Sequence, residues 1–444
     1  MFWRKKSKTE PIATTKSKEA STRERTKGSE AAYELLNERK RRFIEGDRTL
    51  WIIFTVLLVV SILVVYSSTA KMAYDRTSSM TTTDSLRQQI MLVVMAIPTI
   101  FIVHKIDHKV FFHATPIFYY LFILLTVATY FVGSTTNGAA RWIAIGPIQF
   151  QPSEGLKIFT ILMLARRMES RQDTINTINL LPTSWRLRDV KQRKILRENT
   201  WPLLGPVVMS CAVILPAHTS STVLIFLVSV IMLYIGRVRI KEIAKFVVIM
   251  SAVGIISLSL LSAVGVGRGD TAGGRLSAWV NEWTGDGMVD ASYDLSDTQR
   301  AMIAIHQGGL LGEGAGHSTS RAVVIHPESD YAYAFFVSEY GLIIALILMM
   351  LYLWIFFRSI EICRQCTRAF PALMSVGLGL LITCQALLHI LVQVNFIPET
   401  GQTLPFISRG GTSLLFTTAA LGMILSVSRT NQLQRIQNER NKTR

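Results

Sequence analysis

The apolar segment GPIQFQPSEGLKIFTILML carries Gln151, Glu154 and Lys157 among its polar residues. A charge within an apolar helix costs free energy unless it is paired, and it commonly marks a functional site. Glu154 and Lys157 are three residues apart, so a helix that begins near Pro152 would place them on the same face. Two interpretations stay open. The residues could form an internal ion pair that neutralises both charges, or a pair that in addition lines a polar cavity.

Asp330 and Glu339 are two of the three carboxylates in HPESDYAYAFFVSEYG, where a polar stretch gives way to an apolar one. Asp330 lies at the boundary, and Glu339 follows about two and a half helical turns later, so the two would face roughly opposite ways. We therefore do not expect a cooperating pair. Asp330 could be the N-cap of the following helix, since Asp is favoured there. It could also be an exposed carboxylate that acts as a general base beside an external cavity.

The segment NFIPETGQTLPFISRGGTSLL joins two apolar stretches and is rich in proline, glycine and hydroxyl side chains. Irregular backbone at membrane depth is tolerated where it is buried in protein or lines a wet cavity. Arg409 with the amides of Gly410 and Gly411 could bind an anion. The alternative is a simple re-entrant turn with an interfacial arginine, and the composition does not decide between them.

Gln385, His389 and Gln393 recur every four residues and form one polar stripe on a predicted helix. Hydrogen bonding between helices is the favoured interpretation. A proton relay is the weaker one, because no carboxylate joins the stripe.

Common cofactor motifs are missing from the sequence. It contains no Walker loop, dinucleotide fingerprint or zinc motif. Cys363 and Cys366 form a CxxC pair without a second ligand pair nearby, which we interpret as coincidence. Any reaction must therefore use a substrate that is already activated, or a gradient.

Membrane-spanning helices must position these residues. Half of the 444 residues are hydrophobic, and stretches such as WIIFTVLLVVSILVVYSS have no polar face, which excludes a soluble helical protein. The sequence predicts an all-α integral membrane protein with ten transmembrane helices. We expect them at Leu50–Ser68, Gln88–His104, Phe111–Val132, Pro152–Met168, Trp201–Pro216, Ser220–Gly236, Ala244–Val264, Tyr331–Phe357, Phe370–Phe396 and Thr412–Val427.

The charge distribution indicates the orientation. The formal net charge is +17, and most of the 47 Lys and Arg residues fall in the two tails and in alternate loops. The positive-inside rule then puts both termini in the cytoplasm. Basic residues beside membrane spans favour anionic membrane lipids as partners, and no nucleic-acid partner is expected.

The expected organisation has one membrane domain between two tails. Residues 1–49 form a basic, disordered cytoplasmic tail, residues 50–429 the ten-helix domain, and residues 430–444 a second basic cytoplasmic tail. The loop 169–200 is basic and cytoplasmic. The loop 265–330, between the seventh and eighth helices, is external, Gly-rich and acidic. We expect this large external loop to fold over the outer membrane surface.

Four motifs, taken in order, resemble the SEDS family (shape, elongation, division and sporulation). They read NGAARWIAIGPIQFQPSEGLK, QRAMIAIHQGGLLGEGAGHS, HPESDYAYAFFVSEYG and PETGQTLPFISRGGTSLL, and the resemblance covers roughly Leu50 to Arg429. It implies a peptidoglycan glycosyltransferase that polymerises lipid II, with inversion at the anomeric carbon and release of undecaprenyl pyrophosphate. The alternatives are a lipid II flippase and a non-catalytic membrane scaffold for a transpeptidase.

The resemblance also implies roles for single residues. Asp330 matches the essential aspartate of the family and would be the base that takes the proton of the acceptor hydroxyl. Glu154 matches a carboxylate of the polar cavity. A divalent cation, Mg or Mn, could assist, but no metal-binding residue is expected. The residues expected to bind substrate, by holding phosphates or ordering the cavity, are Arg141, Gln151, Glu154, Lys157, Arg275, Gln307, Thr403, Ser408 and Arg409.

Some positions depart from the family pattern. Only Ser329 separates the Pro-Glu pair from Asp330, Ser338 replaces the first of two glutamates, and Arg409 stands where an aromatic residue is common. Pro216–Ser220 replaces a common Gln-Pro-Asp-Leu-Gly segment. This last change and the long basic N-terminal tail favour the FtsW-like division branch over the RodA-like branch.

The resemblance further implies partners and a location. The partners would be lipid II, a class B penicillin-binding protein (a single-span transpeptidase), and other division or elongation proteins. We expect a multi-pass protein of the bacterial cytoplasmic (inner) membrane, at the division septum. We also expect an external segment of the transpeptidase to press on the 265–330 loop and activate polymerisation.

Overall fold

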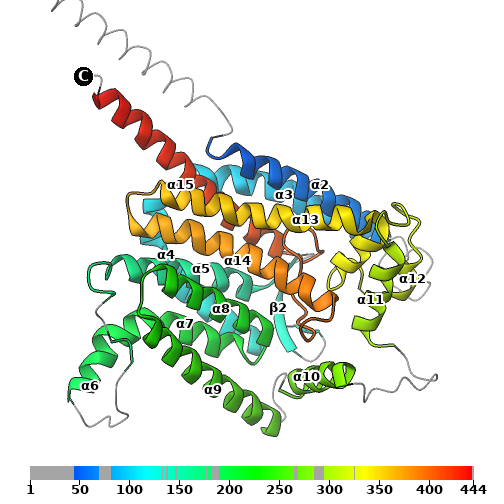
Figure 1. Ribbon diagram of the computed structural model, residues 1–444, viewed down its shortest axis with the longest axis horizontal. Coiled ribbons are helices and arrows are strands. Elements are labelled where there is room, and N and C mark those ends of the chain that lie inside the picture. Colours follow the sequence, from blue (N-terminus) through cyan, green and yellow to red (C-terminus); the bar gives the residue numbers. More distant parts are fainter. Residues whose placement is uncertain are drawn as a thin grey trace, which may run out of the picture.

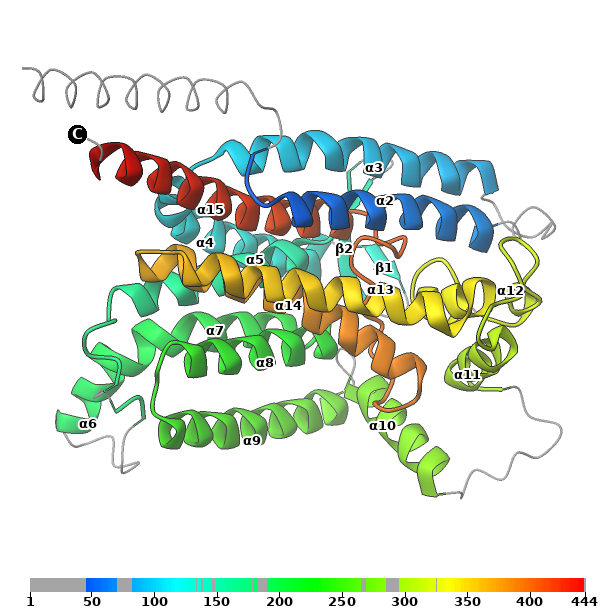
Figure 2. The ribbon, with the colours of Figure 1, turned by 45° about the horizontal axis from the view of Figure 1, so that its top comes forward.

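The computed structural model describes residues 45–69, 82–132, 134–136, 139–145, 148–176, 179–181, 190–264, 269–284, 295–324 and 326–442. Almost all of these residues are helical, and the long helices run side by side as one bundle (Figures 1 and 2). Most of the predicted N-terminal tail lies outside the described residues.

A helix occurs at each position where the sequence predicts a span. These helices are α2 (Arg48–Thr69), α3 (Thr82–Lys105), α4 (His108–Val132), α5 (Pro152–Glu169), α7 (Trp201–Ile214), α8 (Thr219–Ile235), α9 (Ile240–Val264), α13 (Ala332–Arg364), α14 (Ala369–Gln393) and α15 (Ser413–Lys442).

Seven helices in the described part of the chain are long and apolar enough to cross a membrane: α2, α3, α4, α9, α13, α14 and α15. The other three helices at predicted spans are less apolar or shorter. Helix α5 carries Glu154 and Lys157, and α7 and α8 are short. The chain thus has the character of an all-α membrane protein.

The helix at the fifth predicted span begins earlier than predicted. Helix α6 (Val190–Ile195), a π-helical turn at Leu196–Thr200 and α7 follow one another without a break. Ile195 and Thr200, where these pieces meet, both have right-handed helical backbone angles. The sequence did not reveal this start because residues 190–200 are polar and basic, which is typical of a loop.

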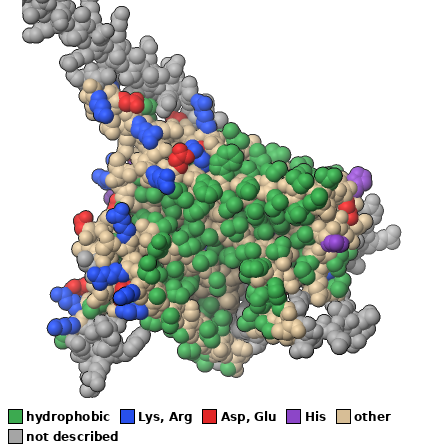
Figure 3. Space-filling view, viewed as in Figure 1, with side chains coloured by type: hydrophobic (Ala, Val, Ile, Leu, Met, Phe, Trp, Pro, Cys, Tyr) green, Lys and Arg blue, Asp and Glu red, His purple; other side chains and the backbone are tan. Residues whose placement is uncertain are grey.

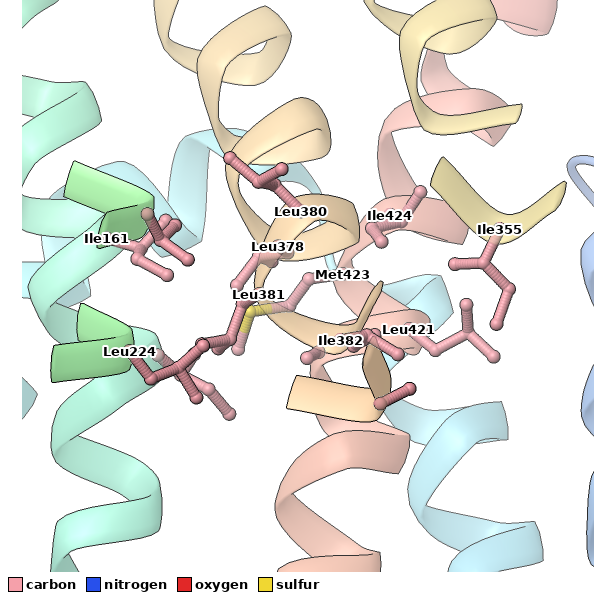
Figure 4. Packing of buried hydrophobic residues seen from close by; sticks show 14 of the residues in the cluster. Ile161, Leu224, Ile355, Leu378, Leu380, Leu381, Ile382, Leu421, Met423 and Ile424 are labelled. Carbon is pink, nitrogen blue, oxygen red and sulfur yellow. The ribbon is translucent and has the colours of Figure 1, made fainter. Parts of the chain in front are cut away.

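The core of the bundle is centred on α14, which packs against α13, α5, α15 and α8. Figure 4 shows Leu381 of α14 between Ile161 of α5 and Leu224 of α8, and all three are buried. Gly377 permits this close packing, because a Cβ atom there would lie 2.7 Å from Ile161 Cγ2 and from Met232 Sδ. Helix α9, by contrast, lies at the edge of the bundle and is mostly exposed (Figure 2).

The surface of the bundle has three zones (Figure 3). Apolar side chains cover the middle of the visible face. Lys and Arg side chains gather at the end that carries α6 and the last turns of α15, and few of them lie at the opposite end, near α11. A broad apolar belt of this kind is typical of a protein surrounded by lipid.

Short elements cover the end of the bundle near α11. The loop predicted at 265–330 contains α10 (Gly269–Thr284), α11 (Asp297–Gly308) and α12 (Ser320–Val323). Ser296 is the N-cap of α11, and its side chain accepts a hydrogen bond from the Gln299 backbone amide. The Gln299 side chain in turn accepts one from the Ser296 backbone amide, which completes a capping box.

A small antiparallel sheet precedes α5 and was not predicted. It consists of β1 (Ser134–Thr136), β2 (Ala139–Ile145) and β3 (Ile148–Phe150), in that order. Strand β2 pairs with both neighbours, for example Ile143 with Phe150. The sequence suggested only an interfacial loop here, because two of the three strands have only three residues each.

Candidate active site at the outer junction

Asp330 lies where two distant segments are joined through their backbones. The carbonyl groups of three consecutive residues accept hydrogen bonds from the loop after α14 or from the end of α14. The Arg409 amide donates to Glu328 O at 2.7 Å, Ser408 Oγ donates to Ser329 O at 2.8 Å, and Gln393 Nε2 donates to Asp330 O at 3.2 Å. Asp330 itself is half-buried. We call this arrangement the outer junction.

Asp330 is not the N-cap of the helix that follows, so this alternative was wrong. The N-cap of α13 is Tyr331, which has non-helical backbone angles and caps no amide with its side chain. The Tyr331 hydroxyl instead donates to Glu399 Oε1 at 2.7 Å, and the Ala334 amide in the first turn donates to Gln393 Oε1. The carboxylate of Asp330 is therefore not needed to begin the helix.

Helix α13 is interrupted ten residues after it begins, although the sequence predicted an unbroken helix. Gly341 has φ 80° and ψ 166°, and the GGLLGEG turn fills the gap. The amides of Leu342 and Ile343 donate to Gly309 O and Leu310 O, while the amide of Glu313 donates to Ser338 O. The turn thus satisfies backbone groups that the break would leave without partners.

Glu339 belongs to this break and not to the outer junction. It is 1% exposed, and it accepts hydrogen bonds from the Gly316 amide at 3.0 Å and from Ser67 Oγ. These contacts come from α2 and from the residues after the GGLLGEG turn, whereas the outer junction is formed by the final loop and the end of α14. That Asp330 and Glu339 do not act as a pair stays a prediction.

Glu154 and Lys157 form a closed ion pair inside the bundle. Lys157 Nζ lies 2.7 Å from Glu154 Oε1 and donates to Gln385 Oε1 at 3.1 Å. Ser413 Oγ donates to Glu154 Oε2 at 3.2 Å. The void beside these side chains is only about 10 Å³, too small for a pyrophosphate. We call Glu154, Lys157, Gln385 and Ser413 the inner polar centre.

The polar stripe of α14 makes hydrogen bonds to other elements, as the sequence predicted. Gln385 bonds to Lys157 of α5 and donates to Thr403 O at 3.1 Å. His389 Nδ1 donates to Gln402 O at 2.7 Å, and its Nε2 accepts from Gln393. The stripe therefore holds the final loop in place and connects the inner polar centre with the outer junction.

The final loop is a re-entrant segment buried between helices. Ile407 O accepts a hydrogen bond from Ser61 of α2 at 3.2 Å, and Pro405 O accepts one from Tyr352 of α13 at 2.5 Å. Arg409 is half-buried and donates from Nη2 to Gln88 Oε1 of α3 at 2.7 Å. The loop is therefore re-entrant, and the backbone amide of Arg409 joins it to Glu328, two residues before Asp330. Anion binding by Arg409 stays a prediction.

The outer junction carries several ionisable groups. His326 lies 3.7 Å from Glu328, and this pairing raises the pKa of His326, with Asp330 adding to the effect. Burial alone would raise the pKa of Glu328, but the interaction with His326 outweighs it, so the pKa of Glu328 lies below its ordinary value. Burial, together with the nearby Glu399 carboxylate, raises the pKa of Asp297.

The structure distributes the other predicted substrate-binding residues over several places. Gln151 is buried at the start of α5, and its backbone amide donates to Thr412 Oγ1 at 3.1 Å. Thr403 belongs to the final loop and contacts the inner polar centre, because its carbonyl accepts from Gln385 and its hydroxyl lies 3.4 Å from that of Ser413. Gln307 is exposed and accepts a hydrogen bond from Ser320 at 2.8 Å. Arg141 is in β2, but its side chain lies outside the described part of the structure.

Arg275 lies apart from these residues, beside Glu399, a carboxylate that was not among the predicted site residues. Its Nε is 3.8 Å from Glu399 Oε2. Glu399 also accepts from Tyr331 and from Thr298, so it joins α10, α11 and the start of α13. The only signal for it in the sequence was its place in the PETG turn. Among the described residues, no group of three or more His, Cys, Asp or Glu side chains could hold a metal ion.

Comparison with known proteins identifies relatives along nearly the whole chain. Residues 47–433 match the FtsW/RodA/SpoVE family model, described as cell cycle protein. A probable peptidoglycan glycosyltransferase FtsW of Coxiella burnetii is 29% identical over 69% of this chain and 75% of its own length. Stage V sporulation protein E of Bacillus subtilis is 26% identical over 86% of this chain and 97% of its own length.

Solved structures have the same fold. A chain from a peptidoglycan synthase complex, in which polymerization and crosslinking are coordinated, aligns with a TM-score of 0.61 at 19% identity and covers 87% of this chain and 98% of that chain. The rod shape determining protein RodA of Thermus thermophilus aligns with a TM-score of 0.55 at 19% identity over 87% of this chain and 97% of that chain. With the match over residues 47–433, the chain belongs to the SEDS family of FtsW, RodA and SpoVE proteins, on its FtsW-like side.

Proposed function

We propose that this protein is a peptidoglycan glycosyltransferase that polymerises lipid II during cell division. Relatives along most of the chain carry the name peptidoglycan glycosyltransferase FtsW. The observation that carries the proposal is the outer junction, where three consecutive carbonyl groups up to Asp330 are held by residues of the final loop and α14. This construction fixes a half-buried carboxylate at one end of a membrane bundle.

In the proposed reaction Asp330 takes the proton from the acceptor sugar hydroxyl as that oxygen attacks the anomeric carbon of the donor. A single displacement inverts the anomeric configuration and releases undecaprenyl pyrophosphate. Pyrophosphate is already a good leaving group, so it needs a cation more than an acid. Arg409, next to Ser408 in the outer junction, is the cation that we assign to this role.

The inner polar centre has a supporting role in this proposal. Its charges are paired and its hydrogen bonds reach the final loop through Gln385 and Thr403. The enclosure of Lys157, which is 1% exposed, argues against the flippase alternative, because a transport path would need these charges to meet water or substrate. Nothing in the described residues favours a pure scaffold.

We further propose ten membrane spans with both termini in the cytoplasm. The gathering of Lys and Arg side chains at the α6 end of the bundle supports this orientation (Figure 3). The outer junction would then face the outside of the cytoplasmic membrane, at the septum. We propose a class B penicillin-binding protein as the partner. A divalent cation stays a prediction.

The test is polymerisation of purified lipid II by the purified protein with its candidate transpeptidase, comparing wild type with Asp330→Asn. Loss of a general base should lower the rate by about 10²- to 10⁴-fold. The variant should keep the wild-type melting temperature and still bind its partner, since Asp330 is not the helix cap. Normal polymerisation by Asp330→Asn would overturn the assignment of the base. If wild type does not polymerise lipid II with any such partner, the flippase and scaffold alternatives would be favoured.

A further inference from the structure

A cavity of about 420 Å³ opens beside the outer junction. Arg275 and Trp279 of α10 form one wall, Asp297 and Thr298 at the start of α11 form another, and Glu399 of the final loop closes it. Its volume falls within the range of small-molecule binding sites in proteins. Three segments far apart in the sequence therefore enclose one site.

The charge in this cavity disfavours phosphate. Arg275 lies 3.8 Å from Glu399, so its charge is already matched by one carboxylate, and Asp297 adds a second. A pyrophosphate would meet repulsion from these carboxylates. A neutral molecule rich in hydroxyl groups would instead donate hydrogen bonds to them, and bonds to ionised acceptors are the stronger kind.

The aromatic wall suits a sugar ring. Trp279 is half-buried, and its Nε1 donates to Asn395 O at 3.2 Å, which satisfies the polar edge of the indole inside the protein. What the side chain adds to the cavity is therefore mainly apolar ring surface. Sugars have apolar C–H faces and a polar rim, so an aromatic surface opposite carboxylates is complementary to them.

The cavity is connected to the segment of Asp330 through side-chain hydrogen bonds. Glu399 Oε1 accepts from the Tyr331 hydroxyl at 2.7 Å and from Thr298 Oγ1 at 3.0 Å. Tyr331 directly follows Asp330 in the chain. A ligand in this cavity would therefore lie beside Glu399, whose hydrogen-bond partner Tyr331 is the neighbour of the proposed catalytic base in the chain.

We infer that this cavity, walled by Trp279, Asp297 and Glu399, binds the uncharged N-acetylhexosamine chain of the glycan, while the pyrophosphate lies elsewhere, near Arg409. The inference rests on the proposed function and deepens it, because it separates the sugar subsite from the phosphate subsite. It also changes the expected role of Arg275, which orders Glu399 and does not hold a phosphate.

The experiment measures binding without catalysis. A β-1,4-linked tetramer of N-acetylglucosamine is titrated into the purified full-length protein in detergent, and binding is followed by saturation-transfer NMR and calorimetry. Trp279→Ala should weaken binding by about tenfold or more, and Glu399→Gln by about threefold. Inorganic pyrophosphate should not compete with the tetramer.

Trp283→Ala is the matched control. Trp283 is on the same helix, and its Nε1 donates to the same Asn395 O at 3.1 Å, but it does not line the cavity. This variant should bind the tetramer as wild type does, and so should Asp330→Asn, which separates binding from catalysis. Glu399→Gln serves as the second cavity variant if Trp279→Ala fails to fold.

Three outcomes would overturn the inference. The first is no binding of the tetramer by a wild-type protein that polymerises lipid II. The second is equal weakening by Trp279→Ala and Trp283→Ala. The third is unchanged tetramer binding in both cavity variants with weaker binding of the transpeptidase, which would make this surface a protein contact. Tetramer binding in a protein that does not polymerise lipid II would uphold the glycan site and reject only the proposed reaction.

Discussion

The inner polar centre and the outer junction both place charged groups within a helix bundle, but they are built differently. At the inner polar centre, Lys157 is 1% exposed, pairs with Glu154 at 2.7 Å and lies beside a void of about 10 Å³. At the outer junction, the backbone of Glu328–Asp330 makes the contacts, and a cavity of about 420 Å³ adjoins it.

This difference separates support from chemistry. A paired and enclosed charge cannot readily meet a substrate, so its contribution is to the position of its neighbours, and breaking the pair would leave an uncompensated buried charge. At the outer junction the carboxylate is only half-buried, and its position is fixed through backbone hydrogen bonds. If a charged residue inside a membrane segment were the only criterion, the inner polar centre would have been chosen as the reactive site.

The largest expected effect on stability is that of Lys157→Met. The substitution would leave Glu154 as a buried charge without its partner and should cost about 3–5 kcal/mol of unfolding free energy. Lys245→Met is the matched control, because Lys245 also pairs with a glutamate three residues before it at 2.7 Å but is 47% exposed. It should cost about 1 kcal/mol or less, because the buried Glu242 keeps its hydrogen bonds from the Leu180 and Leu181 amides. Thermal unfolding in detergent measures both, and equal losses would break the comparison.

The next effect concerns the break in α13. In Gly341→Ala the new Cβ would lie 2.4 Å from Leu310 O, at backbone angles that side chains rarely adopt. We expect a loss of about 3 kcal/mol in unfolding free energy, with lower polymerisation activity. Gly254→Ala in α9 is the control, since no atom lies within 4 Å of the new Cβ. It should stabilise the helix by about 0.5–1 kcal/mol, and a loss there as large as at Gly341 would contradict this account.

A smaller effect is expected for Ser408→Ala at the outer junction. Its hydroxyl donates to Ser329 O at 2.8 Å and accepts from the Leu404 amide at 2.8 Å. Losing both bonds should cost about 1–2 kcal/mol. Polymerisation should fall about tenfold, mainly in kcat, because Asp330 is less well positioned. In Thr418→Ala, which removes only a bond to Leu414 O in its own helix, activity should not change. Equal activity in both variants would show that the junction does not position the base.

The smallest effect is the pH dependence of the His326–Glu328 pair. The pKa of His326 is raised from 6.5, so its contribution is complete below about pH 6.5 and is lost as pH rises through the raised value. The pKa of Glu328 is lowered from 4.5, so its contribution is lost only as pH falls through the lowered value. His326→Gln should therefore lower the melting temperature most between about pH 4.5 and 6.5, and not at about pH 9. A difference that is the same at every pH would contradict this pairing.

The sequence by itself determined the membrane character, the helix positions and the family. A long stretch of apolar residues has few favourable environments other than the membrane interior. The pairing of Glu154 with Lys157 follows from their spacing within one helix. The polar stripe of Gln385, His389 and Gln393 was likewise visible as a repeat of four, and its hydrogen bonds to other elements were predicted correctly.

Only the tertiary structure showed that Asp330 is not the N-cap of α13 and which segments surround it. Its place outside the helix cap, the break at Gly341 and the role of Glu399 all depend on contacts between residues far apart in the chain. The start of the helix at Val190 was missed for a different reason, because residues 190–200 are polar and basic, which is typical of a loop. Local spacing reports which side chains share a helix face, but a junction between loops is stabilised by backbone groups that every residue possesses, and these leave no pattern in the sequence.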